Sequence, residues 1–113
     1  MEYKRTDRVG DLIRKEIASM LLQGDIKDPR IGMVTITIVK LSPDFRNATV
    51  FFSLIGSEQD KARSTNGLNS ATGYIRRRLA KALKLKRIPT ITFEFDDSIE
   101  YSSHIAEVLK DVH

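Results

Sequence analysis

The first pattern along the chain is that of an amphipathic helix near the N-terminus. Its apolar stripe recurs at helical spacing and consists of Val9, Leu12, Ile13, Ile17, Met20 and Leu21. We expect Thr6 or Asp7 to cap a helix that runs to about Gln23. Gly24 suits the left-handed position that ends a helix, and Asp28-Pro29 cannot continue one.

The next two stretches alternate between apolar and polar positions, which is typical of half-buried strands. In residues 33–41 the apolar side is expected to hold Val34, Ile36 and Ile38, opposite Thr35 and Thr37. Residues 42–47 predict a turn. A second strand over residues 48–54 is expected to place Val50, Phe52 and Leu54 on one side. Two strands joined by a short turn predict an antiparallel hairpin.

A second helical pattern follows a polar stretch. We expect residues 56–65 to form a loop that leads into the helix. The apolar stripe of that helix consists of Leu68, Ala71, Ile75, Leu79, Ala82 and Leu83. Gly73 interrupts the stripe, and a glycine inside a helix costs about 1 kcal/mol relative to alanine. We therefore predict that two helices meet near Ala71-Thr72-Gly73; the alternative is one slightly weakened helix.

The last part of the chain predicts one more strand and one more helix. Residues 90–95 alternate, with Ile91, Phe93 and Phe95 on one side. Asp96-Asp97-Ser98 suits the cap of a C-terminal helix that carries Ile99, Ile105, Val108 and Leu109. The order predicts a single α+β domain over residues 1–113, a three-stranded sheet with helices on one face.

Composition excludes several classes of site. The chain has 113 residues and no cysteine, so zinc–thiolate sites, iron–sulfur clusters and thiol nucleophiles are ruled out. No apolar stretch approaches the roughly 20 residues of a membrane helix, and no signal-peptide pattern precedes the first helix. We expect a cytoplasmic protein with no membrane contact.

No catalytic constellation emerges from the sequence. There is no glycine-rich phosphate loop. Asp97, Ser103 and His104 are the residue types of a hydrolytic triad. Ser103 and His104 are adjacent, however, and their side chains would project about 100° apart on a helix. We expect no metal site, no cofactor and no enzymatic activity.

Charge is the strongest functional signal. The net charge is +4, yet residues 61–87 contain nine basic residues and no acidic one. They are Lys61, Arg63, Arg76, Arg77, Arg78, Lys81, Lys84, Lys86 and Arg87. Four of them, Arg76, Arg77, Lys81 and Lys84, are expected on the helix half opposite the apolar stripe, and Lys86 and Arg87 extend the row. Such a row is typical of a surface that binds nucleic-acid phosphates.

Two further points complete the charge pattern. Lys4, Arg5 and Arg8 form a second candidate group of RNA-binding cations at the N-terminus. The alternative interpretation is that the basic helix merely solvates its surface and that the domain is a protein–protein adaptor without RNA contact.

The order of elements resembles a type II KH domain, but the Gly-x-x-Gly loop of that fold is absent. Ala71-Thr72-Gly73 stands at the corresponding place, and this Ala-x-Gly pattern resembles the ribosome-binding factor A family. Further matching segments are Arg5-x-x-Arg8-Val9, Asp28-Pro29-Arg30-x-Gly32 and Pro89-x-Ile91-x-Phe93. Tyr101-Ser102-Ser103 departs from the family, many of whose members have a glycine there.

The resemblance implies binding to the free 30S ribosomal subunit and its 16S ribosomal RNA. It implies a role in late maturation of the subunit, including processing of the 5′ region of the RNA, that matters especially in the cold. It also implies a non-enzymatic protein whose release an assembly GTPase promotes. We expect it to act as a monomer.

Overall fold

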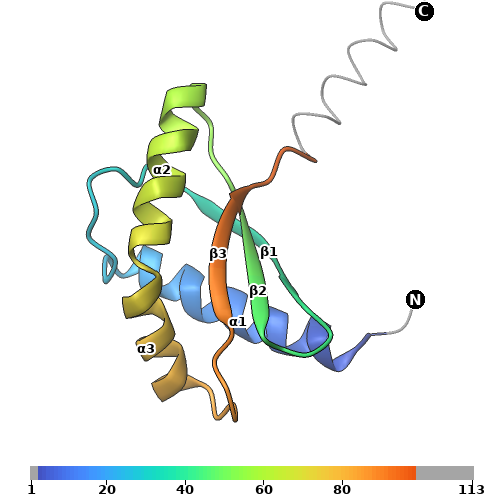
Figure 1. The fold of residues 1–113 in the computed structure, drawn as a ribbon. Helices are drawn as coiled ribbons and strands as arrows, with labels where there is room; N and C mark the ends of the chain where they lie inside the picture. The colour runs from blue at the N-terminus through green and yellow to red at the C-terminus, as the bar shows by residue number, and fades with distance from the viewer. Residues whose placement is uncertain (1–2, 99–113) are drawn as a thin grey trace, which may run out of the picture.

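The computed structural model describes residues 3–98 (Figure 1). Its elements are α1 (Arg5–Leu22), β1 (Thr35–Leu41), β2 (Asn47–Ser53), α2 (Glu58–Ser70), α3 (Thr72–Ala82) and β3 (Thr90–Phe95). The predicted C-terminal helix, with His104 and Tyr101-Ser102-Ser103, lies outside the described residues. Within residues 3–98, no helix is both long and apolar enough to cross a membrane.

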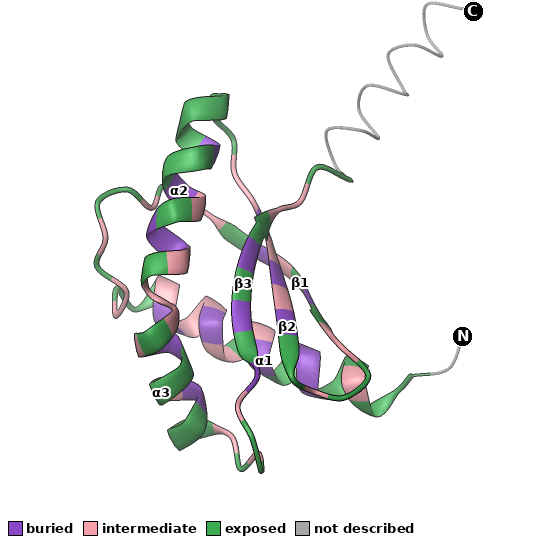
Figure 2. Cartoon of the chain, viewed as in Figure 1, coloured by how far each residue is buried: buried purple, intermediate pink, exposed green. Residues whose placement is uncertain are grey.

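The sheet has β2 at its centre. β1 pairs with β2 antiparallel, which confirms the predicted hairpin, and β3 pairs with β2 in parallel. Parallel neighbours require a long crossover connection, and α2 and α3 supply it. The three helices pack on one face of the sheet, as predicted, and more and less buried positions alternate along β2 and β3 (Figures 1 and 2).

The core lies between that sheet face and the helices. Its buried side chains are Val9, Ile13, Ile17, Met20, Ile36, Val39, Ala48, Val50, Phe52, Leu68, Ile75, Leu79, Ile91 and Phe93. Most positions of the predicted apolar stripes converge on one cluster, because each helix or strand can bury only its apolar side. Leu12 and Ala82, which the stripes also included, are exposed.

The start of α1 differs from the prediction. The residue before the helix is Lys4, and neither Thr6 nor Asp7 is the cap. Asp7 lies inside the first turn, where its carboxylate accepts a hydrogen bond of 3.0 Å from the Lys4 N–H. An acidic side chain in the first turn satisfies a free amide and the helix dipole from within the helix. At the other end, Gly24 has φ 75°, as the sequence predicts.

The alternation predicted for the first strand is wrong at one position. Ile38 is 44% exposed, and Val39 is buried in its place. The pairing register shifts between Ile36 and Ile38, which lie opposite Phe52 and Phe51. An extra residue in one strand moves every later side chain to the opposite face. The bulge depends on the partner strand, so the pattern of β1 alone could not reveal it.

The polar stretch predicted as a loop is largely helix. α2 begins directly after Ser57, whose hydroxyl accepts from the Asp60 N–H at 3.1 Å. The Asp60 carboxylate accepts in turn from the Ser57 N–H at 2.9 Å. This reciprocal capping pair fixes the start of a helix that buries few apolar side chains. The spacing Ser-x-x-Asp was the sequence signal for it.

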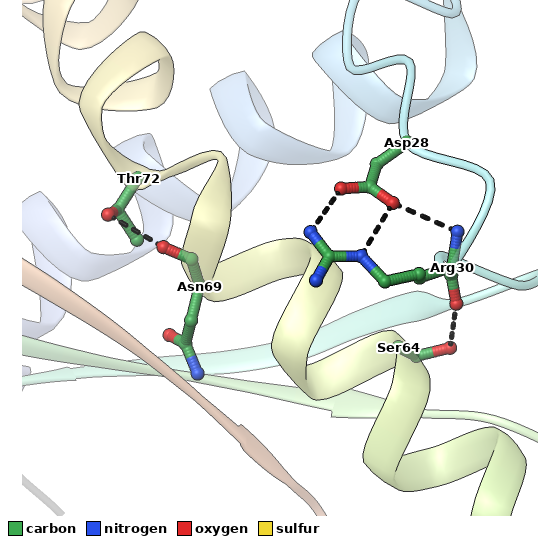
Figure 3. Close-up of polar contacts among 5 residues, drawn as sticks. All are labelled: Asp28, Arg30, Ser64, Asn69 and Thr72. Atoms are coloured by element: carbon green, nitrogen blue, oxygen red, sulfur yellow. Dashed lines mark hydrogen bonds and ion pairs between the residues drawn. The ribbon is translucent and has the colours of Figure 1, made fainter.

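The helix break lies at Ala71, where α2 ends and α3 begins, and this excludes one continuous helix. Asn69 fixes the end of α2 against the edge of β3: its Oδ1 accepts from the Phe93 N–H at 2.9 Å, and its Nδ2 donates to the Phe93 carbonyl at 3.4 Å. The Thr72 hydroxyl donates to the freed Asn69 carbonyl at 2.9 Å (Figure 3). These contacts set the direction in which α3 leaves.

Gly73 has no positive φ, so the predicted meeting of two helices does not depend on a left-handed backbone conformation at this glycine. A Cβ built there meets only the Arg77 Nη1, at 3.7 Å, which is ordinary contact. Gly73→Ala is therefore expected to raise the free energy of unfolding by up to about 1 kcal/mol, because alanine favours the helix. Urea unfolding at constant m-value measures this change. A clear loss of stability would show that the break needs glycine itself.

Candidate nucleic-acid interface

Three segments far apart in the sequence meet at one end of the sheet, where β2 and β3 begin (Figure 1). The turn of residues 42–46 is tied to the start of β3 by a 2.9 Å hydrogen bond from the Thr90 N–H to the Arg46 carbonyl. That turn also contacts the first residue of α1, since the Arg5 guanidinium lies 5.5 Å from the centre of the Phe45 ring. Residues 83–89, the loop before β3, arrive at the same place. We call this region the hairpin end.

Exposed cations gather on α3 and the loop that follows. They are Arg77, Lys81, Lys84, Lys86 and Arg87. The structure corrects the placement of Lys84: α3 ends at Ala82, and the next residue, Leu83, already has extended backbone angles of φ −115° and ψ 131°. Lys84 therefore lies on the loop with Lys86 and Arg87, and not on the helix face. The row begins on the helix and continues on the loop toward β3.

Arg76, unlike Arg77, is hydrogen-bonded to the loop that follows α3. Its Nε donates to the Pro89 carbonyl and its Nη2 to the Ile88 carbonyl, both at 3.1 Å. These carbonyls belong to the loop that carries Lys86 and Arg87. Arg76 therefore fixes the path of that loop against α3. The charge pattern predicted Arg76 to be a surface cation equivalent to Arg77 and gave no signal for this contact.

Arg76→Ala is expected to lower the free energy of unfolding by about 1–2 kcal/mol, because two carbonyls lose a charged donor. Arg77→Ala, the same change on the next residue, is expected to stay within about 0.5 kcal/mol. Urea unfolding of the two variants side by side measures the difference. Equal stabilities would mean that the contacts of Arg76 add nothing to the fold.

Two other basic residues of the 61–87 block also serve the fold. Arg78 pairs with Asp25 at 3.4 Å and donates to the Tyr74 hydroxyl at 2.9 Å, which links α3 to the segment after α1. Lys61 is only 8% exposed; its ammonium lies 3.0 Å from a Glu58 carboxylate oxygen and 4.4 Å from the centre of the Phe95 ring. The charge count of the block therefore overstates its free surface charge.

The N-terminal cations Lys4, Arg5 and Arg8 are all exposed at the start of α1. Because Arg5 reaches the ring of Phe45, this group belongs to the hairpin end as well. The two groups that the sequence treats separately thus lie at the same end of the molecule. One cation there was missed: Arg46, in the turn between them. Residues 31–60 carry net negative charge, so the charge pattern gave no signal for it.

Three aromatic side chains that could stack on bases are Tyr3, Phe45 and Tyr74, and of these only Tyr3 is exposed. Tyr3 is 63% exposed, and its hydroxyl donates to Asp11 at 2.7 Å, which raises its pKa. Phe45 and Tyr74 are partly buried against the core. An interface of this kind reads the phosphate backbone and the shape of an RNA more readily than unstacked bases. Within residues 3–98, no three histidine or carboxylate side chains are grouped to hold a metal ion.

The Asp28-Pro29-Arg30-x-Gly32 motif is structural in this chain. The Asp28 carboxylate accepts from the Arg30 guanidinium at 2.7 and 3.0 Å and from the Arg30 N–H at 2.9 Å (Figure 3). Ser64 of α2 donates to the Arg30 carbonyl at 3.4 Å and accepts from the Gly32 N–H at 3.0 Å. The motif fastens the segment before β1 to α2.

The Arg30 side chain, by its hydrogen bonds, lowers the pKa of Asp28 from 3.8 to about 2. Because the folded value is the lower one, this carboxylate stabilises the fold fully above about pH 3.8 and stops doing so as the pH falls through about 2. Asp28→Asn is expected to flatten the acid branch of the stability curve between these two values. Thermal melts across that range test this, and an unchanged acid branch would contradict it.

The amino-acid sequence of the chain matches one protein family along almost its whole length. The profile of the family described as Ribosome-binding factor A matches residues 5–109. A relative of that name from Citrifermentans bemidjiense is 50% identical over 109 residues, 96% of this chain and 91% of the relative.

Two sets of coordinates from related proteins have a similar fold. A solution NMR structure of a ribosome binding factor A candidate from Thermotoga maritima gives a TM-score of 0.76 at 33% identity and covers 88% of this chain and 94% of that one. A homology model of a Thermus thermophilus ribosome binding factor A, fitted into the cryo-EM map of a 30S complex of that factor, gives a TM-score of 0.57 at 20% identity, over 76% of this chain and 93% of that one.

Proposed function

Since this chain belongs to the ribosome-binding factor A family, we propose that it binds the free 30S ribosomal subunit and its 16S ribosomal RNA through the hairpin end and acts in late maturation of that subunit. One observation carries the site: the start of α1 and the α3–β3 loop, separated by most of the chain, present their exposed cations at one end of the sheet. A homology model of the Thermus thermophilus factor, which shares the fold, was fitted into a map of the 30S complex of that factor, and this supports the proposal.

The proposed RNA ligands are the exposed cations of the hairpin end and α3. They are Lys4, Arg5, Arg8, Arg77, Lys81, Lys84, Lys86 and Arg87. Arg76 contributes by holding the loop, and the break at Ala71 and Gly73 sets the direction of α3. Arginine forks match phosphate oxygens and lysines add point charge, so the surface suits the backbone of a folded RNA.

The proposed role requires binding only and no catalytic group. A protein that binds one of two RNA conformations more tightly shifts the population toward it, by as much as its two affinities differ. In this way the chain would favour the mature fold of the 16S RNA and make its 5′ region available for processing. The effect matters most in the cold, where misfolded RNA rearranges slowly.

The remaining parts of the proposal concern partners and place. We propose that the chain acts in the cytoplasm as a monomer, as one RNA-binding domain over residues 1–113. An assembly GTPase, by remodelling the particle, would promote its release. The family match over residues 5–109 supports the single domain.

Sedimentation of purified 30S subunits with the chain, across a salt series, tests the function. RNA phosphate contacts predict co-migration that weakens with salt, with a log–log slope of about −0.7 to −0.9 per contact. Crosslinks to the 16S RNA are expected in the same fractions. Co-migration without salt dependence and with crosslinks to ribosomal proteins alone would favour the adaptor interpretation.

A further inference from the structure

The turn between β1 and β2 holds the backbone of Arg46 in one place. The Arg46 N–H donates to the Asp44 carboxylate at 3.0 Å, and the Arg46 carbonyl accepts from the Thr90 N–H at 2.9 Å. Ser42 closes the turn: its hydroxyl donates to Asp44 at 2.6 Å and accepts from the Asn47 N–H at 3.0 Å. Both peptide groups of Arg46 are therefore fixed before any ligand arrives.

The turn also contains backbone strain. Phe45 has φ 61°, a left-handed conformation that non-glycine residues rarely adopt and that costs of order 1–3 kcal/mol. Its ring packs against the core and lies under the Arg5 guanidinium. Strain of this kind persists where the surrounding contacts over-determine the backbone, and such positions cluster at binding sites.

The guanidinium of Arg46, in contrast, is almost uncommitted. Its side chain is 67% exposed, and its Nε lies 3.9 Å from Asp44 Oδ2, at the outer limit of an ion pair. The Asp44 carboxylate is already engaged by the Ser42 hydroxyl and the Arg46 N–H, which together lower its pKa. An exposed pair at this distance contributes little to stability. The side chain thus has no strong role in the fold.

Arg46 also lies between the two cation groups. Its carbonyl is bonded to Thr90, and Arg87 precedes Thr90 by three residues, a chain length of at most about 11 Å. On the other side, the neighbouring Phe45 ring is 5.5 Å from the Arg5 guanidinium. Phosphates along one RNA strand recur at a spacing of several ångströms, so a row of cations this close can follow a single backbone.

We propose that Arg46 is a phosphate ligand preorganised by the Ser42–Asp44 turn, and that it joins the α1 cations and the α3–β3 loop cations into one surface that a single RNA backbone crosses. This inference rests on the proposed RNA-binding function and deepens it. Preorganisation raises affinity because little backbone freedom remains to be lost on binding.

Binding of Arg46→Ala to purified 30S subunits across a salt series tests the ligand. The expected result is a several-fold loss of affinity and a salt slope flatter by about one unit. Arg63→Ala is the matched control, since Arg63 is an exposed arginine of α2 that lies near Leu54 and Ile55, beyond the end of β2 and thus at the opposite end of the sheet. It removes the same charge and is expected to leave the slope unchanged.

The outcomes separate the two proposals. If the unaltered chain binds with a salt slope and Arg46→Ala behaves like Arg63→Ala, Arg46 is not a ligand and the inference is overturned, while the proposed function stands. If the unaltered chain shows no salt-dependent binding, the proposed function itself fails.

A double-mutant cycle tests the preorganisation. Ser42→Ala removes the hydroxyl that closes the turn and is expected to weaken binding several-fold when Arg46 is present. In the Arg46→Ala background the same change is expected to have little effect. Equal losses in both backgrounds would overturn the claim that the turn positions Arg46. Thermal melts of all four proteins confirm that they are folded.

Discussion

Gly10→Ala is expected to lower the free energy of unfolding by about 1–3 kcal/mol, although alanine is the better helix former. α1 crosses β1 so closely at this point that a Cβ on residue 10 would lie 2.6 Å from the Val39 carbonyl oxygen and 3.5 Å from its carbon. Both atoms belong to the strand backbone and cannot rotate away. The helix must therefore move off the sheet, which opens the core around Val9 and Ile13.

The measurement is urea unfolding, with the m-value as a check that the two states are unchanged. Gly73→Ala is the matched control: it is the same substitution in another helix, where the added Cβ meets only the end of a flexible side chain. The two variants are expected to change stability in opposite directions. If Gly10→Ala were as stable as the unaltered chain, the close approach of α1 to β1 would be wrong.

Local patterns were sufficient to predict most of the fold. The apolar stripe of α1 and the alternation along β2 and β3 depend only on the period of each element, and the α+β arrangement with a three-stranded sheet that they predict is confirmed. Two features failed because they depend on something other than apolar period. The bulge at Ile38 is set by the partner strand, and the start of α2 is set by the polar pair Ser57 and Asp60.

The candidate nucleic-acid interface could be predicted only in part from the sequence. The charge pattern correctly marked Arg77, Lys81 and Arg87 as exposed, but it could not distinguish them from Arg76, whose guanidinium holds a loop. That distinction depends on where the chain returns after α3. The parallel pairing of β3 with β2 brings the loop beside the hairpin turn, and a count of charges along the chain contains no such information.

The triple variant that replaces Arg77, Lys81 and Arg87 by alanine is expected to weaken 30S binding by about two orders of magnitude. This loss corresponds to about 1 kcal/mol for each phosphate contact removed. All three side chains are exposed, so the fold is expected to survive, which the loss of Arg76 would not guarantee. The log–log salt slope should flatten by about three units, because each lost contact removes about one.

A control variant with the same change of charge separates contact from overall attraction. Lys15, Lys27 and Arg63 are also exposed, and none of them lies on α3 or on the three segments of the hairpin end. Their joint replacement by alanine lowers the net charge equally and is expected to reduce affinity only slightly, through weaker long-range steering that salt screens. Equal losses of affinity and equal slopes in the two triple variants would mean that 30S binding responds to net charge alone. The surface formed by α3 and the hairpin end would then not be the RNA interface, because only a surface in contact with phosphates makes the position of a cation matter.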